Sequence, residues 1–125
     1  MVYHIYVIEL SPSVQQERRW YQENPQQETG ESYYVGQTKH SPECRFEQHV
    51  TRRGAPYQCI PVCSLQENVS PYAVGRARFA ADYAVTLRPD LCEGLGPFAT
   101  RDDAENAERN LTSSLQEDGH GAYSR

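Results

Sequence analysis

YYVGQTKHSPECRFEQH, residues 33–49, changes within seventeen positions from an aromatic, apolar segment to a helical pattern. Residues 32–37 combine aromatic and β-branched side chains, which is typical of a strand. Serine, proline and glutamate at residues 41–43 then form a helix-start signal, with an acidic group in the first turn. The pattern therefore predicts a strand followed by a helix from about residue 42 to residue 52 or 53.

The segments around this stretch predict an α+β fold. Val2 to Leu10 has strand composition and is expected to pair with residues 32–37. Residues 11–31 lengthen their connection and contain a short, mostly exposed helix at 13–23. A further short helix is expected over Tyr72 to Ala81 and a third strand near Tyr83 to Leu87. We expect one domain over residues 1–125, with a small three-stranded, mostly antiparallel sheet flanked by helices and an insertion at about 11–31.

Residues 100–115 carry the clearest helical pattern of the chain. Thr100 can cap the helix, acidic residues occupy its first turn, and Gly119 follows its end. Its inward stripe consists of small and aliphatic side chains three and four positions apart: Ala104, Ala107, Leu111 and Leu115. Glu108 falls on or beside this stripe, where a buried carboxylate needs an arginine, a tyrosine hydroxyl or a metal ion as its partner.

The charge is unevenly distributed along the chain. The formal net charge is −5, which argues against a protein that coats nucleic acid by bulk attraction. Residues 36–88 nevertheless carry seven basic against four acidic groups, whereas both flanking segments are acidic. This basic segment is either the solvated surface of an ordinary domain or a surface that faces phosphate.

Cysteine content and hydropathy suggest a cytoplasmic protein. No apolar run is long enough to span a membrane, and the first ten residues lack the features of a signal peptide. In such a compartment the four cysteines are expected to be reduced thiols. The alternative is a structural zinc site made from thiols and an imidazole: Cys44, His49, Cys59 and Cys63.

An ordered set of motifs resembles the GIY-YIG nuclease family. HIYVIEL at 4–10 and YVGQT at 34–38 match its two strand motifs, Arg45 and His49 lie four apart on the following helix, and Glu108 lies on a late helix. Tyr6 corresponds to the tyrosine of the first motif. Tyr34 corresponds to that of the second because it has the family's offset from Gly36, although Tyr33 is an alternative match.

The resemblance implies a metal-dependent endonuclease that hydrolyses phosphodiester bonds in DNA, with RNA as another potential substrate. Glu108 is implied as the ligand of Mg²⁺ or Mn²⁺, and Arg45 as the residue that binds a phosphate oxygen. Tyr34 is expected to act as the general base, with Tyr6 positioning the water or sharing that role, and His49 to assist by a hydrogen bond. Contacts to the phosphate backbone of the nucleic acid are expected from basic side chains: Lys39, Arg52 and Arg53, with Arg76 and Arg78 as further candidates.

A second hypothesis is a catalytically inactive module of the same fold that binds nucleic acid or protein. Two features favour it, namely the acidic balance and His4, which stands where the family usually has glycine. The tyrosines would then be core residues, and Arg45 with Glu108 a structural ion pair. Both hypotheses require the first and second strands and the late helix to lie together.

Overall fold

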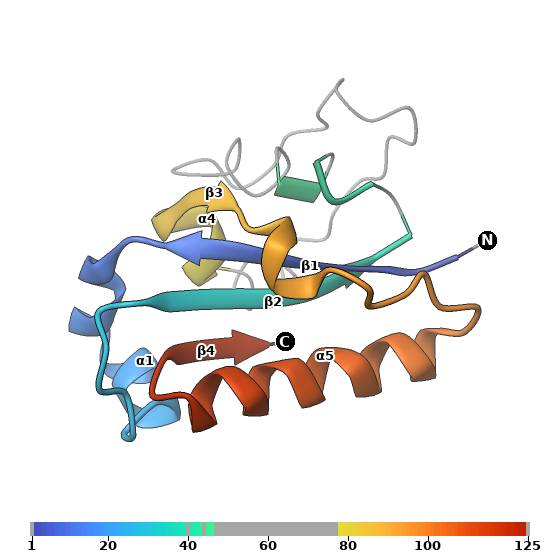
Figure 1. The fold of residues 1–125 in the computed structure, drawn as a ribbon. Helices are drawn as coiled ribbons and strands as arrows, with labels where there is room; N and C mark the ends of the chain where they lie inside the picture. Colours follow the sequence, from blue (N-terminus) through green and yellow to red (C-terminus); the bar gives the residue numbers. More distant parts are fainter. Residues whose placement is uncertain (1, 40, 44, 47–77, 125) are drawn as a thin grey trace.

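The strands form one mixed sheet in the computed structural model, which describes residues 2–39, 41–43, 45, 46 and 78–124. The strand order is β3-β1-β2-β4 (Figure 1), with bounds β1 His4–Leu10, β2 Ser32–Thr38, β3 Ala84–Leu87 and β4 Gly121–Ser124. β1 pairs antiparallel with both β2 and β3, and its pairing with β2 confirms the predicted pairing of the first two strands. The α+β class is confirmed. The three-stranded sheet is wrong in detail, because β4 adds a strand parallel to β2.

Side chains alternate between the two faces of the sheet. Ile5 and Val7 of β1 belong to one buried cluster, which includes Ala104 and Leu115 of the late helix. Tyr6 and Ile8 belong to a second cluster on the opposite face, which includes Trp20. The sheet is therefore covered on both faces, and successive residues of β1 pack into different clusters.

The late helix, α5, spans Arg101–Glu117. The Thr100 hydroxyl accepts a hydrogen bond from the Asp103 N–H at 3.2 Å, as the sequence predicts for the cap. Gly119 adopts a φ of +87° after the helix end, where glycine carries no Cβ penalty. The predicted inward stripe is confirmed, since its members are buried or packed against the first cluster: Ala104, Ala107, Leu111 and Leu115.

The insertion is built from two short helices rather than one. η1 is a 3₁₀ helix over Pro12–Gln16 and α1 an α-helix over Arg18–Glu23, with Glu17 in extended conformation between them. Val14 and Trp20 are both buried, at 0% and 1% exposure. Six residues correspond to about 600° of rotation on an α-helix, which leaves the two side chains about 120° apart, so a continuous helix would not point both toward the same core. The break at Glu17 allows both to reach the core.

The remaining helical segments lie beside the sheet. α4 spans Arg78–Tyr83 and a second 3₁₀ helix, η2, spans Pro89–Cys92. The described residues at the start of the predicted 42–53 helix are helical, and Arg45 N–H donates to the Ser41 carbonyl at 3.1 Å. Phe46 packs against the second cluster. The rest of that helix lies outside the described residues.

Asn24 holds β4 to the insertion. It is 2% exposed, and its Oδ1 accepts hydrogen bonds from Ala122 N–H at 2.8 Å and from Gln116 Nε2 at 3.1 Å. Asn24→Ala would leave a buried donor of β4 unpaired, which costs about 1–3 kcal/mol. We expect urea denaturation to show this loss, with exposed Gln22→Ala as the control. Equal stability of the two variants would contradict the assigned role of Asn24.

Candidate functional site

A polar cavity lies beside β2, beyond the end of the edge strand β4. β4 pairs only with Ser32 to Val35, whereas β2 continues to Thr38. The N-terminal half of α5 extends beyond the end of β4 (Figure 1). Residues from β1, β2, the helical segment after β2 and α5 line a space of about 240 Å³: Tyr6, Tyr34, Gly36, Gln37, Arg45, Arg101, Glu105 and Glu108. This polar cavity has room for several water molecules or a phosphate group.

Tyr6 reaches the polar cavity because Gly36 lies opposite it. The two residues are direct partners in the antiparallel pairing of β1 and β2. A Cβ atom at Gly36 would lie only 2.4 Å from both Cζ and Oη of Tyr6. The phenol ring of Tyr6 therefore packs directly against the Gly36 backbone, and a side chain at residue 36 would displace the ring.

Tyr34 comes from the same face of the sheet, two residues before the glycine. Its ring centroid lies 6.4 Å from that of Tyr6, with the planes tilted by 38°. Each tyrosine is only 2% exposed, and both line the polar cavity. Residues on adjacent strands and one face can present their polar ends to a common space.

Tyr33, the alternative match for the second motif, belongs to the opposite face. It packs in the first cluster, with the His120 ring edge-on at a centroid distance of 5.7 Å. Burial and the nearby Glu31 carboxylate raise the pKa of Tyr33, against the lowering effect of the Arg88 guanidinium. A raised pKa disfavours the phenolate, so both the position of Tyr33 and its pKa argue against Tyr33 as the base.

Glu108 supplies a buried carboxylate to the polar cavity. The residue is 5% exposed and lies on α5 between the buried Ala104 and Thr112. Thr112 donates its hydroxyl hydrogen bond to the backbone carbonyl of Glu108 at 2.8 Å, not to the carboxylate. The position matches the sequence prediction of a carboxylate on or beside the inward stripe of α5.

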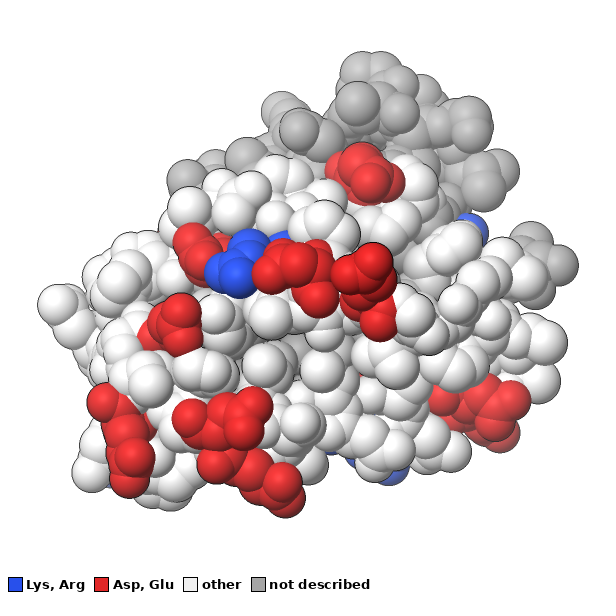
Figure 2. Space-filling model, in the orientation of Figure 1, with Lys and Arg blue, Asp and Glu red and all other residues white. Residues whose placement is uncertain are grey.

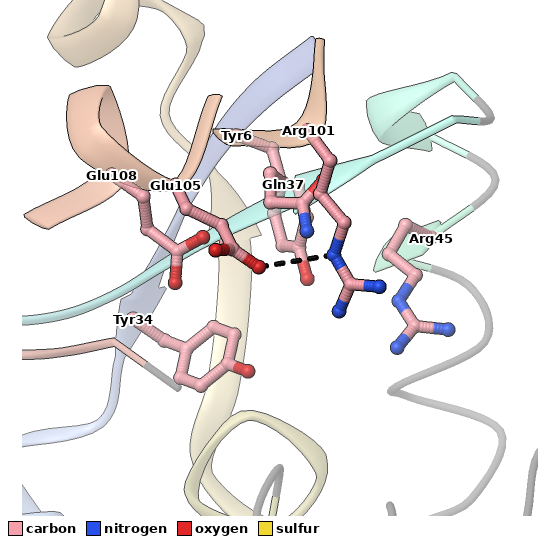
Figure 3. A pocket seen from close by; sticks show the side chains of 8 residues that line it. Tyr6, Tyr34, Gln37, Arg45, Arg101, Glu105 and Glu108 are labelled. Atoms are coloured by element: carbon pink, nitrogen blue, oxygen red, sulfur yellow. Dashed lines mark hydrogen bonds and ion pairs between the residues drawn. The ribbon is translucent and has the colours of Figure 1, made fainter. Parts of the chain in front are cut away.

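Two arginines and a second glutamate complete the charged lining. Arg101 Nε donates to Glu105 Oε1 at 3.0 Å, one turn apart on α5. In the view of Figure 3 the guanidinium groups of Arg45 and Arg101 occupy one side of the polar cavity and the carboxylates of Glu105 and Glu108 the other. The lining thus combines groups that can bind a phosphate with groups that can bind a cation.

Four of the candidate residues lie together in the structure, and the others do not join them among the described residues. The structure brings Tyr6, Tyr34, Arg45 and Glu108 to one cavity. Lys39 is exposed after the end of β2 and is not among the lining residues. Several further candidates lie outside the described residues or have side chains outside them: His49, Arg52, Arg53, Arg76 and Arg78. Cys44, Cys59 and Cys63 of the alternative zinc site lie outside the described residues too.

Gln37, Arg101 and Glu105 are lining residues that the sequence analysis missed. On α5, residues 101, 105 and 108 follow the spacing i, i+4, i+7, which places all three on one helix face. That spacing was a usable signal. It was obscured because Arg101 and Glu105 also read as an ordinary exposed ion pair.

The donor set fits a divalent cation of the Mg²⁺ type. Within the described part of the chain, no three His, Cys, Asp or Glu side chains group together as a metal cage. Mg²⁺ does not require such a cage, since one or two carboxylates commonly hold it together with water and substrate phosphates. Glu108 presents one carboxylate of this kind to the polar cavity, whereas the Glu105 carboxylate is paired with Arg101.

The opposite face of the sheet is acidic. Figure 2 shows the η2 side of the molecule with many acidic and few basic side chains. Arg88 is ion-paired there to Glu9 at 2.7 Å and to Asp90 at 2.9 Å. These contacts lower the pKa of Asp90, chiefly through its hydrogen bond with Arg88. A polyanion would be repelled from this face.

Comparison with known proteins gives no relative. No protein-family description, curated protein or solved structure matches the chain. Among the described residues, no helix has both the length and the apolar character required to cross a membrane.

Proposed function

We propose that the chain is a metal-dependent endonuclease that hydrolyses phosphodiester bonds in DNA, with a GIY-YIG-like fold and site. The observation that carries this proposal is the meeting of Tyr6, Tyr34, Arg45 and Glu108 around one cavity. Core tyrosines and a structural ion pair would not require a shared, phosphate-sized space. Phosphodiester hydrolysis requires such a space, together with charge stabilisation and a group that accepts a proton.

Arg45 and the tyrosines have distinct roles in the proposed reaction. Arg45 binds a nonbridging phosphate oxygen with its planar fork of donors. Tyr34 accepts the proton of the attacking water, and Tyr6 fixes the position of that water. A phenol with a pKa of about 10 is ionised in roughly one molecule per thousand at pH 7, so positive charge beside it favours the basic form.

Glu108 holds the divalent cation in this proposal. A Mg²⁺ or Mn²⁺ ion bound there would neutralise charge on the phosphate and stabilise the leaving 3′ oxygen. The carboxylate is buried on α5, a helix of 17 residues, and is therefore in place before substrate binds. Since the opposite face of the sheet is acidic, DNA would approach from the side of the polar cavity.

The proposal is tested by a panel of nucleic acids of different shapes. Duplex, single-stranded and branched DNA, with matched RNA, would be incubated with the purified chain in Mg²⁺ or Mn²⁺. We expect cleavage of at least one DNA substrate and none in the presence of EDTA. Binding without cleavage across the panel would instead support the inactive module, and cleavage restricted to RNA would change the substrate class.

Tyr34→Phe is expected to separate catalysis from folding. The substitution removes one hydroxyl from a 2% exposed ring and keeps the rest of its packing. Loss of a general base typically costs 10²- to 10⁴-fold, and we expect a fall of about that size in the single-turnover cleavage rate. Tyr33→Phe on the opposite face is the matched control and should cleave at nearly the wild-type rate. Equal effects of the two substitutions would exclude Tyr34 as the base.

A further inference from the structure

Arg101 occupies a position that helix stability does not favour. It is the first residue of α5, where the helix dipole is positive and a cation is unfavourable by about 0.3–1 kcal/mol. Asp102 and Asp103 in the same turn complement the dipole, whereas Arg101 opposes it. A residue that breaks a local rule without a structural benefit points to a functional constraint.

The ion pair with Glu105 does not compensate for this position. Its side chains are 67% and 36% exposed, and exposed helical pairs of this kind contribute little. The order is also the weaker one, because a base that precedes an acid by four residues is less stabilising than the reverse. Stability alone therefore gives little reason for an arginine at residue 101.

The guanidinium group of Arg101 retains donors for a ligand. Its hydrogen bond to Glu105 uses Nε, and within the described part of the chain this is the only side-chain hydrogen bond that Arg101 makes. Nη1 and Nη2 are therefore available at the polar cavity, on the side that Arg45 occupies in Figure 3. Paired Nη donors match the spacing of two phosphate oxygens.

We propose that Arg101 is a second phosphate-binding residue of the polar cavity and that Glu105 is the residue that positions it. The Glu105 carboxylate fixes the plane of the guanidinium group through Nε, and the two Nη groups donate to oxygens of the phosphate that Arg45 also binds. As an account of the substrate complex, this inference rests on the proposed nuclease function. Phosphate binding itself can be measured without cleavage.

Inorganic phosphate tests the inference independently of catalysis. Its dissociation constant would be measured by calorimetric titration at constant ionic strength, with sulfate as a second probe. We expect Arg101→Ala to weaken phosphate binding about tenfold or more, since a charged hydrogen-bonded contact is lost. Arg109→Ala is the matched control, because Arg109 is an exposed arginine two turns later on α5 that does not line the polar cavity. This variant should bind within about twofold of wild type.

Glu105 variants separate positioning from simple charge. Glu105→Gln keeps an oxygen acceptor for Arg101 Nε and should bind phosphate nearly as well as wild type. Glu105→Ala removes the acceptor and should weaken binding, with the melting temperature of every variant within about 3 °C of wild type. Three results would each overturn the inference: no phosphate binding by wild type, equal losses in Arg101→Ala and Arg109→Ala, or no loss in Arg101→Ala. Phosphate binding through Arg101 with no cleavage of any nucleic acid would refute the nuclease function alone.

Discussion

Glu108→Gln is expected to abolish measurable cleavage. The substitution keeps the volume and shape of a side chain that is 5% exposed, but it removes the negative charge that the proposed divalent cation requires. Loss of one preorganised electrostatic contact costs about 10²- to 10³-fold, and loss of the cation would cost at least that much. Single-turnover rates in Mg²⁺ and Mn²⁺ would measure the effect.

The matched control for this variant is Glu117→Gln. Glu117 is an exposed glutamate near the end of the same helix, and its substitution should leave the cleavage rate unchanged. Mn²⁺ binding, followed by electron paramagnetic resonance, gives a readout besides activity and should weaken in Glu108→Gln only. Cleavage by Glu108→Gln at the wild-type rate would rule out this carboxylate as the metal ligand.

Gly36→Ala should damage both stability and activity. The added Cβ would lie 2.4 Å from Cζ and Oη of the buried Tyr6 ring, so the ring must move. Overpacking of this kind costs about 1–3 kcal/mol, which corresponds to a fall in melting temperature of roughly 5–10 °C. Displacement of a reacting group by about 1 Å can cost 10²-fold in rate, so we expect a loss of at least that size.

A double-substitution cycle tests the cause of this effect. In a Tyr6→Leu background the clashing ring end is absent, so Gly36→Ala should cost much less free energy of unfolding than in wild type. Gly30→Ala is the control, because a Cβ there would have no atom within 4 Å and the backbone φ lies outside the left-handed region. Equal costs of Gly36→Ala in both backgrounds would show that the Tyr6 ring is not what excludes a side chain at residue 36.

The sequence predicted the elements whose signals are local. β1, β2, β3 and α5 each begin and end within about two residues of their predicted bounds, since composition, caps and stripes are properties of the segments themselves. β4 was missed because four residues, GAYS, carry no such signal. Its position depends on non-local contacts, namely parallel pairing with β2 and the hydrogen bond from Ala122 to Asn24.

The site was predictable where residue order carried information. The two tyrosines, Arg45 and Glu108 form an ordered set along the chain, and the structure places all of them at one cavity. Arg101 and Glu105 are not part of these ordered motifs. Their helical spacing with Glu108 places them on one helix face, and this face lines a cavity because α5 extends beyond the end of β4.

The central claim is that water attacks a phosphodiester at the polar cavity. Cleavage of the DNA panel in H₂¹⁸O with Mg²⁺, followed by mass spectrometry of the products, tests it most directly. The account predicts one ¹⁸O atom in the 5′ phosphate of each new end, an unlabelled 3′ hydroxyl, and no product from Glu108→Gln. Absence of product from wild type, or an unlabelled phosphate, would contradict the claim.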